Sequence, residues 1–265
     1  MNTNIFRNIA HINWRVKDNR EKMEEALVSV QKTLGRVCPP MINGEQFPLS
    51  QKRIFSYDPA SLEVTCETCE SGEALVQKAE QAAQRAFESR ALHDVEKRVT
   101  LLRRVAEIVH ERMFDIAALM VYEVSKPWNE ALAEVEEGID FLNLYATAAE
   151  QTFLKSHEHQ PWIKAEKNTL VYTPRGVTAA ISAWNFPFAL SLEKIAASIA
   201  AGCPVLFKPA EQSPSVGYEA VKCFLDASVP PEYVAFLQKS FQLIEPQNQS
   251  SLHLSLNLKS LLLDH

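Results

Sequence analysis

The feature that most constrains the fold is an alternation of short apolar runs with helical patterns over residues 177–237. The apolar runs are Val177–Ser182, Val205–Lys208 and Tyr233–Leu237, and the helical patterns between them are Pro187–Ala201 and Val216–Ala227. Parallel strands need a crossover connection, which is usually a helix, so this order is typical of βαβ units. The sequence therefore predicts an α/β fold with a doubly wound parallel sheet.

The residues before this alternation predict mainly helices, with short extended pieces between them. Helical periodicity covers Lys17–Gly35, Glu73–Ser89, Asp94–Met113 and Asn129–Ala149, and the strand-like runs are Met41–Phe47, Arg53–Tyr57, Leu62–Cys66 and Leu170–Thr173. A turn is expected at Asn43-Gly44. The polar stretch Thr152–Asn168 is expected to be a connector. A helical N-terminal region thus precedes the sheet.

The charge balance and the apolar pattern argue against two classes of partner. The 265 residues carry a net charge of -6, so no basic surface is expected for nucleic acid. Charged residues or proline interrupt every apolar stretch before it reaches a membrane-spanning length, and the N-terminus lacks the pattern of a secretory signal. We therefore expect a cytoplasmic protein with neither a nucleic-acid nor a membrane partner.

The five cysteines predict neither disulfides nor a metal site. An odd number of cysteines without an export signal argues against a disulfide framework. Cys66 and Cys69 form a CxxC pair, but zinc would need two more ligands at matching spacing, and no second pair exists. The other candidate ligands, His157 and His159, lie far along the chain. Reduced thiols are therefore expected, and no metal.

The first candidate site segment is Ser182–Phe186, at the end of a predicted strand. Ligands of doubly wound sheets bind at the carboxyl ends of the strands. Pro187 suits the first turn of the following helix, so Asn185 is presented at the mouth of that helix. Its amide can donate to a developing oxyanion or can cap the helix. Local spacing alone favours the cap.

The second candidate segment is Lys208–Ser213, at the end of the next predicted strand. Lys208 and Glu211 are spaced to bind the two neighbouring hydroxyls of a nucleotide ribose, and the carboxylate would repel a 2'-phosphate. The alternative is a surface ion pair, which contributes little to stability. The sequence has no GxGxxG motif, so the usual dinucleotide-binding fingerprint is absent.

The two segments and their surroundings together resemble a known family. The stretch Pro174–Gly217, which contains Trp184-Asn185-Phe186-Pro187 and Lys208-Pro209-Ala210-Glu211, is similar to the cofactor-binding core of the aldehyde dehydrogenase superfamily. Upstream, Leu34–Phe47 and Tyr122–Ala146 resemble one branch, the 1-pyrroline-5-carboxylate (glutamate semialdehyde) dehydrogenases. The resemblance runs from about Asn13 to about Leu237, with Ser125 where the family usually has glycine.

The resemblance implies an NAD-dependent oxidation of L-glutamate γ-semialdehyde, a small-molecule aldehyde, to L-glutamate in proline degradation. In the family, a cysteine thiolate attacks the aldehyde and hydride passes to NAD. By resemblance, Asn185 is the oxyanion-hole amide, and the wall beside the cofactor is Ile181, Ser182, Ala183 and Trp184. The segment that binds the adenosine ribose is Lys208, Pro209, Ala210 and Glu211, and Glu211 favours NAD over NADP.

The C-terminal part departs from the family. Where the family continues with a glycine-rich turn after Leu237, the stretch Lys239–His265 has no glycine and is rich in Leu, Ser and Gln. None of the five cysteines matches the motif of the family's nucleophile, which lies beyond this point together with the general-base glutamate. We therefore expect residues 1–50 to form an N-terminal helix and arm, residues 51–237 a partial NAD-binding domain, and residues 238–265 a non-homologous, poorly ordered tail.

These departures leave three interpretations. The first is a truncated, marginally stable chain that is inactive alone and binds NAD weakly or not at all. The second is an NAD-binding or interaction fragment that pairs with a full-length homologue or with a separate C-terminal half. The third is a sequence error that hides a full enzyme.

Overall fold

A five-stranded sheet forms the centre of the protein. The computed structural model describes residues 6–154, 157–159 and 168–239. The parallel strands β8 (Thr178–Ile181), β9 (Val205–Lys208) and β10 (Val234–Phe236) lie side by side. The antiparallel hairpin of β2 (Met41–Ile42) and β3 (Glu45–Gln46) extends the sheet beyond β10. The predicted α/β fold is therefore confirmed.

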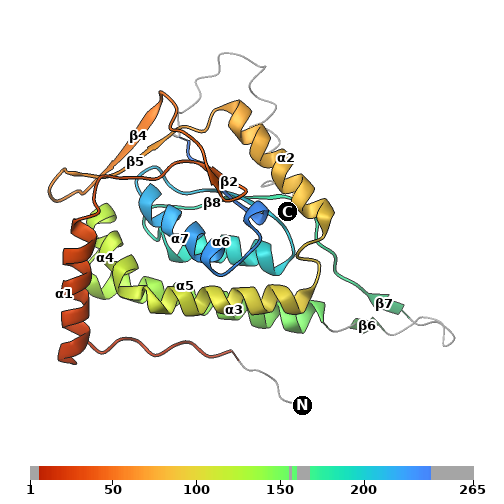
Figure 1. The fold of residues 1–265 in the computed structure, drawn as a ribbon. Helices are drawn as coiled ribbons and strands as arrows, with labels where there is room; N and C mark the ends of the chain where they lie inside the picture. Colours follow the sequence, from red (N-terminus) through yellow and green to blue (C-terminus); the bar gives the residue numbers. More distant parts are fainter. Residues whose placement is uncertain (1–5, 155–156, 160–167, 240–265) are drawn as a thin grey trace.

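Helices cover both faces of this sheet, as a doubly wound fold requires (Figure 1). Helices α6 (Ala189–Ala200) and α7 (Pro214–Asp226) pack on one face, and α2 (Glu73–Ser89) packs on the other. Alternate side chains of one strand point to opposite faces. Accordingly, Phe236 belongs to the main core, on the face of the sheet that α6 and α7 cover. Ala235 packs with Ala79 and Ala82 of α2 on the other face.

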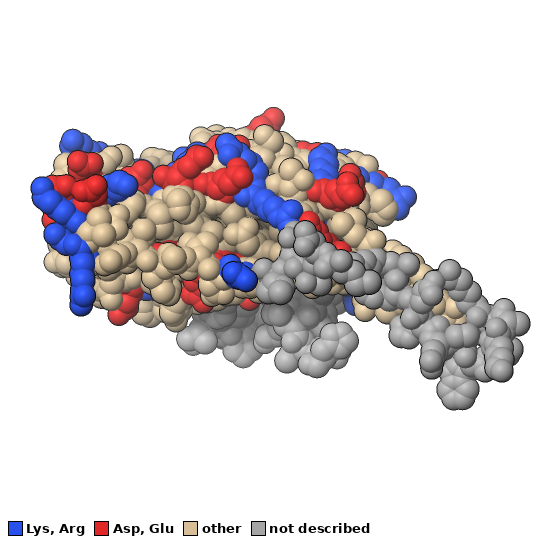
Figure 2. Space-filling view, turned by 90° about the horizontal axis from the view of Figure 1, so that it is seen from below, with Lys and Arg blue, Asp and Glu red and all other residues tan. Residues whose placement is uncertain are grey.

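A second helical layer lies below α6 and α7 (Figure 1). It consists of α3 (Val95–Glu111), α4 (Met113–Val124) and α5 (Trp128–Phe153), and α1 (Lys17–Gln31) crosses α4. The predicted helices are all present, but α4 was not predicted. Its residues 116–120 are all buried, so α4 has no polar face and shows no amphipathic period in the sequence. In Figure 2, acidic and basic side chains are intermingled on the face seen from below, with uncharged residues between them.

The predicted extended pieces form the sheet hairpin and two smaller sheets. Strand β5 (Val64–Cys69) pairs with β1 (Arg36–Val37) and β4 (Arg53–Tyr57). Strand β6 (His157–His159), inside the predicted connector, pairs with β7 (Asn168–Leu170). The strand predicted at Leu170–Thr173 therefore lies earlier in the chain and overlaps β7 only at Leu170. The turn predicted at Asn43-Gly44 is confirmed, and both residues have positive φ, as a tight hairpin turn requires. A short 3-10 helix, η1 (Pro231–Tyr233), precedes β10.

Residues on both sides of the expected boundary at residue 50 share these sheets. Residues 36–46 supply β1 to one sheet and the β2–β3 hairpin to the other. The predicted tail from residue 240 onward lies outside the described residues, and Gln238 is buried, with its backbone N–H donating to Ser71 Oγ at 3.1 Å. No helix of the described part is both long and apolar enough to cross a membrane.

Candidate functional site

The two predicted site segments lie next to each other at one edge of the sheet. In the β8–β9 pair, Ile181 is in register with Lys208, and Ser182 N–H donates to the Lys208 carbonyl at 3.2 Å. This follows from parallel pairing, which places the carboxyl ends of neighbouring strands together. The loop after β8, with Ala183 and Trp184, therefore runs beside the loop after β9.

Glu211 borders an open hollow of about 750 Å³, and Lys208 lies close enough to feel the charge of Glu211. The hollow is lined by Trp184, Glu211 and Gln212, and by Phe55 and Tyr57 of β4. Lys208 Nζ donates to the carbonyl of Pro209 at 3.0 Å. Burial lowers the pKa of the Lys208 ammonium, and the negative charge of Glu211 opposes that shift. A half-buried ammonium beside a carboxylate is suited to binding vicinal hydroxyls.

The loop after β9 lies very close to α7 because Gly217 has no side chain. A Cβ atom at Gly217 would lie 2.4 Å from Cβ and 2.8 Å from Cγ of Pro209, which real side chains do not tolerate. Pro209 and Ala210 are buried, so this contact holds the main chain between Lys208 and Glu211.

Buried glutamates occupy the N-termini of both helices that follow the parallel strands. At α6, Glu134 Oε1 accepts from Phe188 N–H at 2.8 Å and from Ala189 N–H at 3.1 Å. At α7, the two carboxylate oxygens of Glu123 accept from Ser215 N–H at 2.9 Å and Val216 N–H at 2.8 Å. In many doubly wound folds such N–H groups bind phosphate. Here protein carboxylates bind them, in agreement with the missing GxGxxG motif.

Asn185 does not cap α6, so the interpretation favoured by local spacing is wrong. The helix begins at Ala189, and its N–H groups are bound by Glu134. Asn185 is exposed, and its carbonyl accepts from Lys126 Nζ at 3.0 Å. Sequence reasoning missed Glu134 as the cap because it lies on α5, 54 residues before Phe188.

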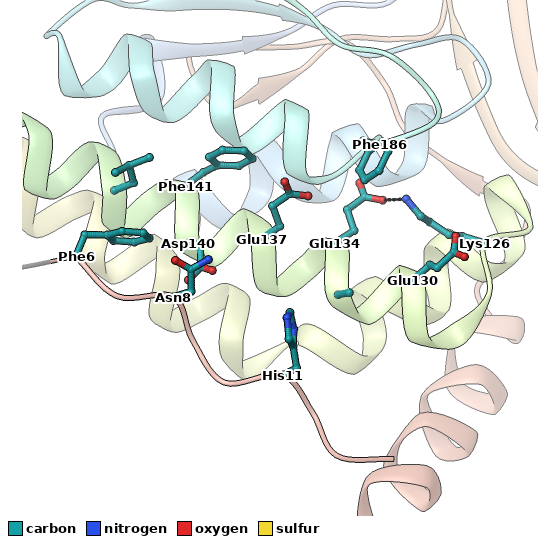
Figure 3. Close-up of a pocket in the computed structure, with 12 residues that line it drawn as sticks. Phe6, Asn8, His11, Lys126, Glu130, Glu134, Glu137, Asp140, Phe141 and Phe186 are labelled. Carbon is teal, nitrogen blue, oxygen red and sulfur yellow. Dashed lines mark hydrogen bonds and ion pairs between the residues drawn. The ribbon is translucent and has the colours of Figure 1, made fainter. Parts of the chain in front are cut away.

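A second pocket, of about 530 Å³, opens beside Phe186, the residue after Asn185 (Figure 3). Its walls are rich in carboxylates: the acidic residues that line it are Glu130, Glu134, Glu137 and Asp140. Burial and the nearby charge of Glu134 raise the pKa of Glu137, and burial raises the pKa of Asp140. The spacing of Glu130, Glu134 and Glu137 along α5 places them on one helix face. This spacing is visible in the sequence and could have predicted an acidic helix face.

The N-terminal arm forms one side of this acidic pocket. Ile9 N–H donates to Asp140 Oδ1 at 2.9 Å, and Ile12 N–H donates to Glu136 Oε1 at 2.7 Å. His11 Nδ1 lies 2.5 Å from Glu136 Oε2, and this contact raises the pKa of His11. Phe6, Asn8 and His11 consequently line the pocket opposite the glutamates (Figure 3).

No cysteine of the sequence borders either pocket. All five are free thiols and all are buried. Burial raises the pKa of Cys223 to about 12, and a hydrogen bond with Cys38 together with burial raises the pKa of Cys66. A thiol must ionise and reach its substrate to act as a nucleophile. The described residues also contain no group of three or more His, Cys, Asp or Glu arranged to hold a metal ion.

Known proteins with similar sequences belong to one family. A family profile described as the aldehyde dehydrogenase family matches residues 48–245. The 1-pyrroline-5-carboxylate dehydrogenase of Staphylococcus aureus is 33% identical over 235 residues, which are 88% of this chain and 45% of that protein. The enzyme of the same name from a Geobacillus strain is 36% identical over 230 residues, 86% of this chain and 44% of the relative. The chain thus spans less than half the length of these curated relatives.

Solved structures give the same result. A mutant of 1-pyrroline-5-carboxylate dehydrogenase from Thermus thermophilus superposes with a TM-score of 0.85 at 35% identity, and the match covers 91% of this chain and 46% of that one. A Thermus structure of the same enzyme with bound NAD superposes with a TM-score of 0.84 over the same shares of the two chains.

Proposed function

This chain belongs to the aldehyde dehydrogenase family, and we propose that it provides the cofactor-binding edge and the oxyanion donor for NAD-dependent oxidation of L-glutamate γ-semialdehyde. The observation that carries this proposal is the β8–β9 pairing, which places Ser182 and Lys208 in hydrogen-bonding contact. Relatives named 1-pyrroline-5-carboxylate dehydrogenase, one of them solved with NAD, support this substrate and cofactor. The substrate would place the reaction in proline degradation.

The residues around the larger hollow fit a nucleotide. Glu211 and the exposed indole of Trp184 line this hollow, and we propose that Glu211 accepts from the ribose hydroxyls while the neighbouring Lys208 donates to them. A carboxylate at this position repels a 2'-phosphate, which favours NAD over NADP. When bound, NAD supplies the hydride acceptor. Asn185 donates its amide to the aldehyde oxygen as negative charge develops there.

The acidic pocket supports an amino-aldehyde as the substrate. Lys126 is paired with Glu134, so the remaining carboxylates, Glu130, Glu137 and Asp140, leave the pocket with excess negative charge. Such a pocket attracts a cation. L-glutamate γ-semialdehyde is a zwitterion, so we propose that the pocket binds its α-ammonium group while its α-carboxylate faces away from these side chains. Phe186 at the pocket rim directly follows Asn185 in the chain. We propose that this chain binds but does not oxidise the aldehyde by itself, since its cysteines are buried away from both pockets.

Calorimetry with NAD and NADP tests the cofactor site. We expect weak NAD binding that falls about tenfold or more in Lys208→Ala and in Glu211→Ala, because each removes a hydrogen bond to a charged group. Glu211→Ala should also reduce the preference for NAD over NADP. The matched control is Lys222→Ala on α7, since the Lys222 side chain is 43% exposed and pairs with Glu219. Equal NAD affinity in all variants would contradict the proposed cofactor site. Production of NADH from the semialdehyde would mean that the chain contains a nucleophile not identified above.

A second candidate function is association with another polypeptide of the same family. The exposed edge of the central sheet supports it. Within the described part of the chain β8 pairs with β9 alone, so β8 is an edge strand. Large apolar side chains are exposed in and after it: Ile181 is 46% exposed, Trp184 54% and Phe186 41%. An apolar sheet edge of this kind is a surface for pairing with another chain.

Co-expression with a full-length homologue tests this association. We expect a complex on size-exclusion chromatography that is lost in Ile181→Lys, because the substitution places a charge on the apolar edge. Val28→Lys on α1, where the side chain is 55% exposed, is the matched control and should leave the complex intact. A homologue that elutes separately from the unmodified chain argues against the association.

A further inference from the structure

We propose that Lys126 is a positioning residue for the loop between β8 and α6, which carries Asn185 and Trp184; this inference rests on the proposed function. The Lys126 ammonium donates to the Asn185 carbonyl at 3.0 Å and forms an ion pair with Glu134. It also lies 3.9 Å from the ring centroid of Phe186. Figure 3 shows Lys126 and Glu134 pointing toward each other beneath Phe186.

The loop needs such an anchor because its central residues are outside regular structure. It starts at Ser182, whose hydroxyl accepts from Ser191 Oγ at 2.9 Å, and it ends where Glu134 binds the first N–H groups of α6. Trp184 and Asn185 between these points are exposed. Lys126 therefore holds the middle of a loop whose two ends are fastened by other groups.

The backbone at the end of α4 directs Lys126 toward the loop. Ser125 ends α4 in the left-handed conformation with φ of +51°, where glycine is favoured. Pro127 is the N-cap residue of α5, so Lys126 lies in the short connection between the two helices. The Lys126 side chain is only 9% exposed and that of Glu134 is fully buried. A charge-assisted hydrogen bond is strong and directional, so the bond from this largely buried ammonium to the exposed Asn185 carbonyl fixes the orientation of that peptide.

The fixed peptide determines where the Asn185 amide points, since the side chain leaves the main chain at that residue. An oxyanion donor is effective when its direction is set before the charge develops. The same anchor holds Trp184 beside the hollow that contains Glu211. Lys126 thus acts on the proposed reaction through Asn185 and Trp184, and its own ammonium is already engaged.

A double variant separates this role from general stability. Removing Lys126 alone would leave Glu134 buried and unpaired, which destabilises a fold strongly. Lys126→Met combined with Glu134→Gln removes both charges and retains an oxygen that can accept from Phe188 and Ala189 N–H. We expect this variant to unfold at a temperature close to that of the unmodified chain.

Hydrogen exchange and NAD calorimetry on this variant provide the test. We expect amide exchange in residues 183–190 to become about tenfold faster than in Glu134→Gln alone, which already changes the acceptor of Phe188 and Ala189 N–H, and NAD affinity to fall about tenfold, because one charge-assisted hydrogen bond is lost. Residues 213–217, where Glu123 fastens α7, should exchange as before. Lys126→Arg, which keeps the charge, should restore slow exchange. The control is Arg103→Met with Glu150→Gln, which removes a more exposed ion pair between α3 and α5. It should change neither the amide exchange of residues 183–190 nor the NAD affinity.

The outcomes are distinct. Unchanged exchange in residues 183–190 overturns the proposal, and so does faster exchange with unchanged NAD affinity, because Lys126 would then only stabilise the loop. An unmodified chain that binds no NAD contradicts the proposed function instead, and exchange alone then decides whether Lys126 holds the loop. If the double variant unfolds, faster exchange of residues 183–190 in Lys126→Met than in Lys126→Arg supports the anchor, and equal exchange in the two overturns it.

Discussion

Replacing Arg98 with methionine should lower the free energy of unfolding by about 3–5 kcal/mol, because buried carbonyls would lose their donor. Arg98 lies on α3 and is 2% exposed. Its Nε donates to the Ala200 carbonyl at 2.9 Å, and its Nη1 donates to the carbonyls of Leu92 and His93, each at 2.8 Å. One guanidinium thus satisfies the end of α6 and the loop that precedes α3. Methionine fills part of the volume and supplies no donor.

Urea unfolding of Arg98→Met and Arg103→Met compares a buried and an exposed arginine on the same helix. Arg103 is 42% exposed and pairs with Glu150 at 2.8 Å, so its loss should cost about 1 kcal/mol or less. A change of that small size in Arg98→Met would mean that water or relaxation satisfies the three carbonyls. In that case Arg98 would not be the main connection between α3 and α6.

The stability of the chain should fall as the pH rises from about 5 to about 8, and Glu123 should account for much of the fall. Burial raises the pKa of Glu123 from 4.5 to about 7, although the N–H groups of Ser215 and Val216 lower it in part. Between these two values the folded chain holds a proton that the unfolded chain releases. Raising the pH therefore favours unfolding, by up to about 3 kcal/mol once the folded carboxyl has ionised.

Unfolding measured at intervals from pH 5 to pH 8 in the unmodified chain and in Glu123→Gln tests this expectation. The glutamine side chain keeps an oxygen for the N-terminus of α7 and cannot ionise, so its stability should depend much less on pH. Glu107→Gln, at an exposed site on α3, should leave the pH dependence unchanged. A Glu123→Gln variant with the same slope as the unmodified chain would place the titrating group elsewhere.

His11 contributes to the pH dependence with the same sign and has to be separated. Its contact with Glu136 raises the pKa of the imidazole in the folded chain, so its stabilising charge is present at low pH and is lost as the pH rises. Asp140 faces the same arm through the Ile9 N–H. The variant His11→Gln removes this contribution and leaves that of Glu123, so the two variants separate His11 from Glu123. Glu137 and Asp140, whose pKa values are also raised, contribute to the remaining slope with the same sign.

Local sequence patterns determined the order and type of most elements. The apolar runs at β8, β9 and β10 and the helical stripes between them were sufficient for the α/β fold, because burial on both faces of a parallel sheet leaves a readable pattern. The same reasoning put the two candidate segments at the carboxyl ends of predicted strands, and the parallel pairing of β8 with β9 brings Ser182 and Lys208 together. Helix α4 was missed because it is apolar on almost every side, with residues 116–120 all buried in a row, so it has no amphipathic period to read.

The tertiary structure alone decided which distant groups complete the site. The partners of the α6 and α7 N-termini, Glu134 and Glu123, lie 54 and 92 residues away in sequence, and Arg98 binds a carbonyl 102 residues away. The local sequence pattern predicts whether a side chain faces the core. Its hydrogen-bond partner depends on how whole helices pack against each other. Asn185 illustrates the difference: its spacing suggested a helix cap, and the packing of α5 against α6 gave that role to Glu134.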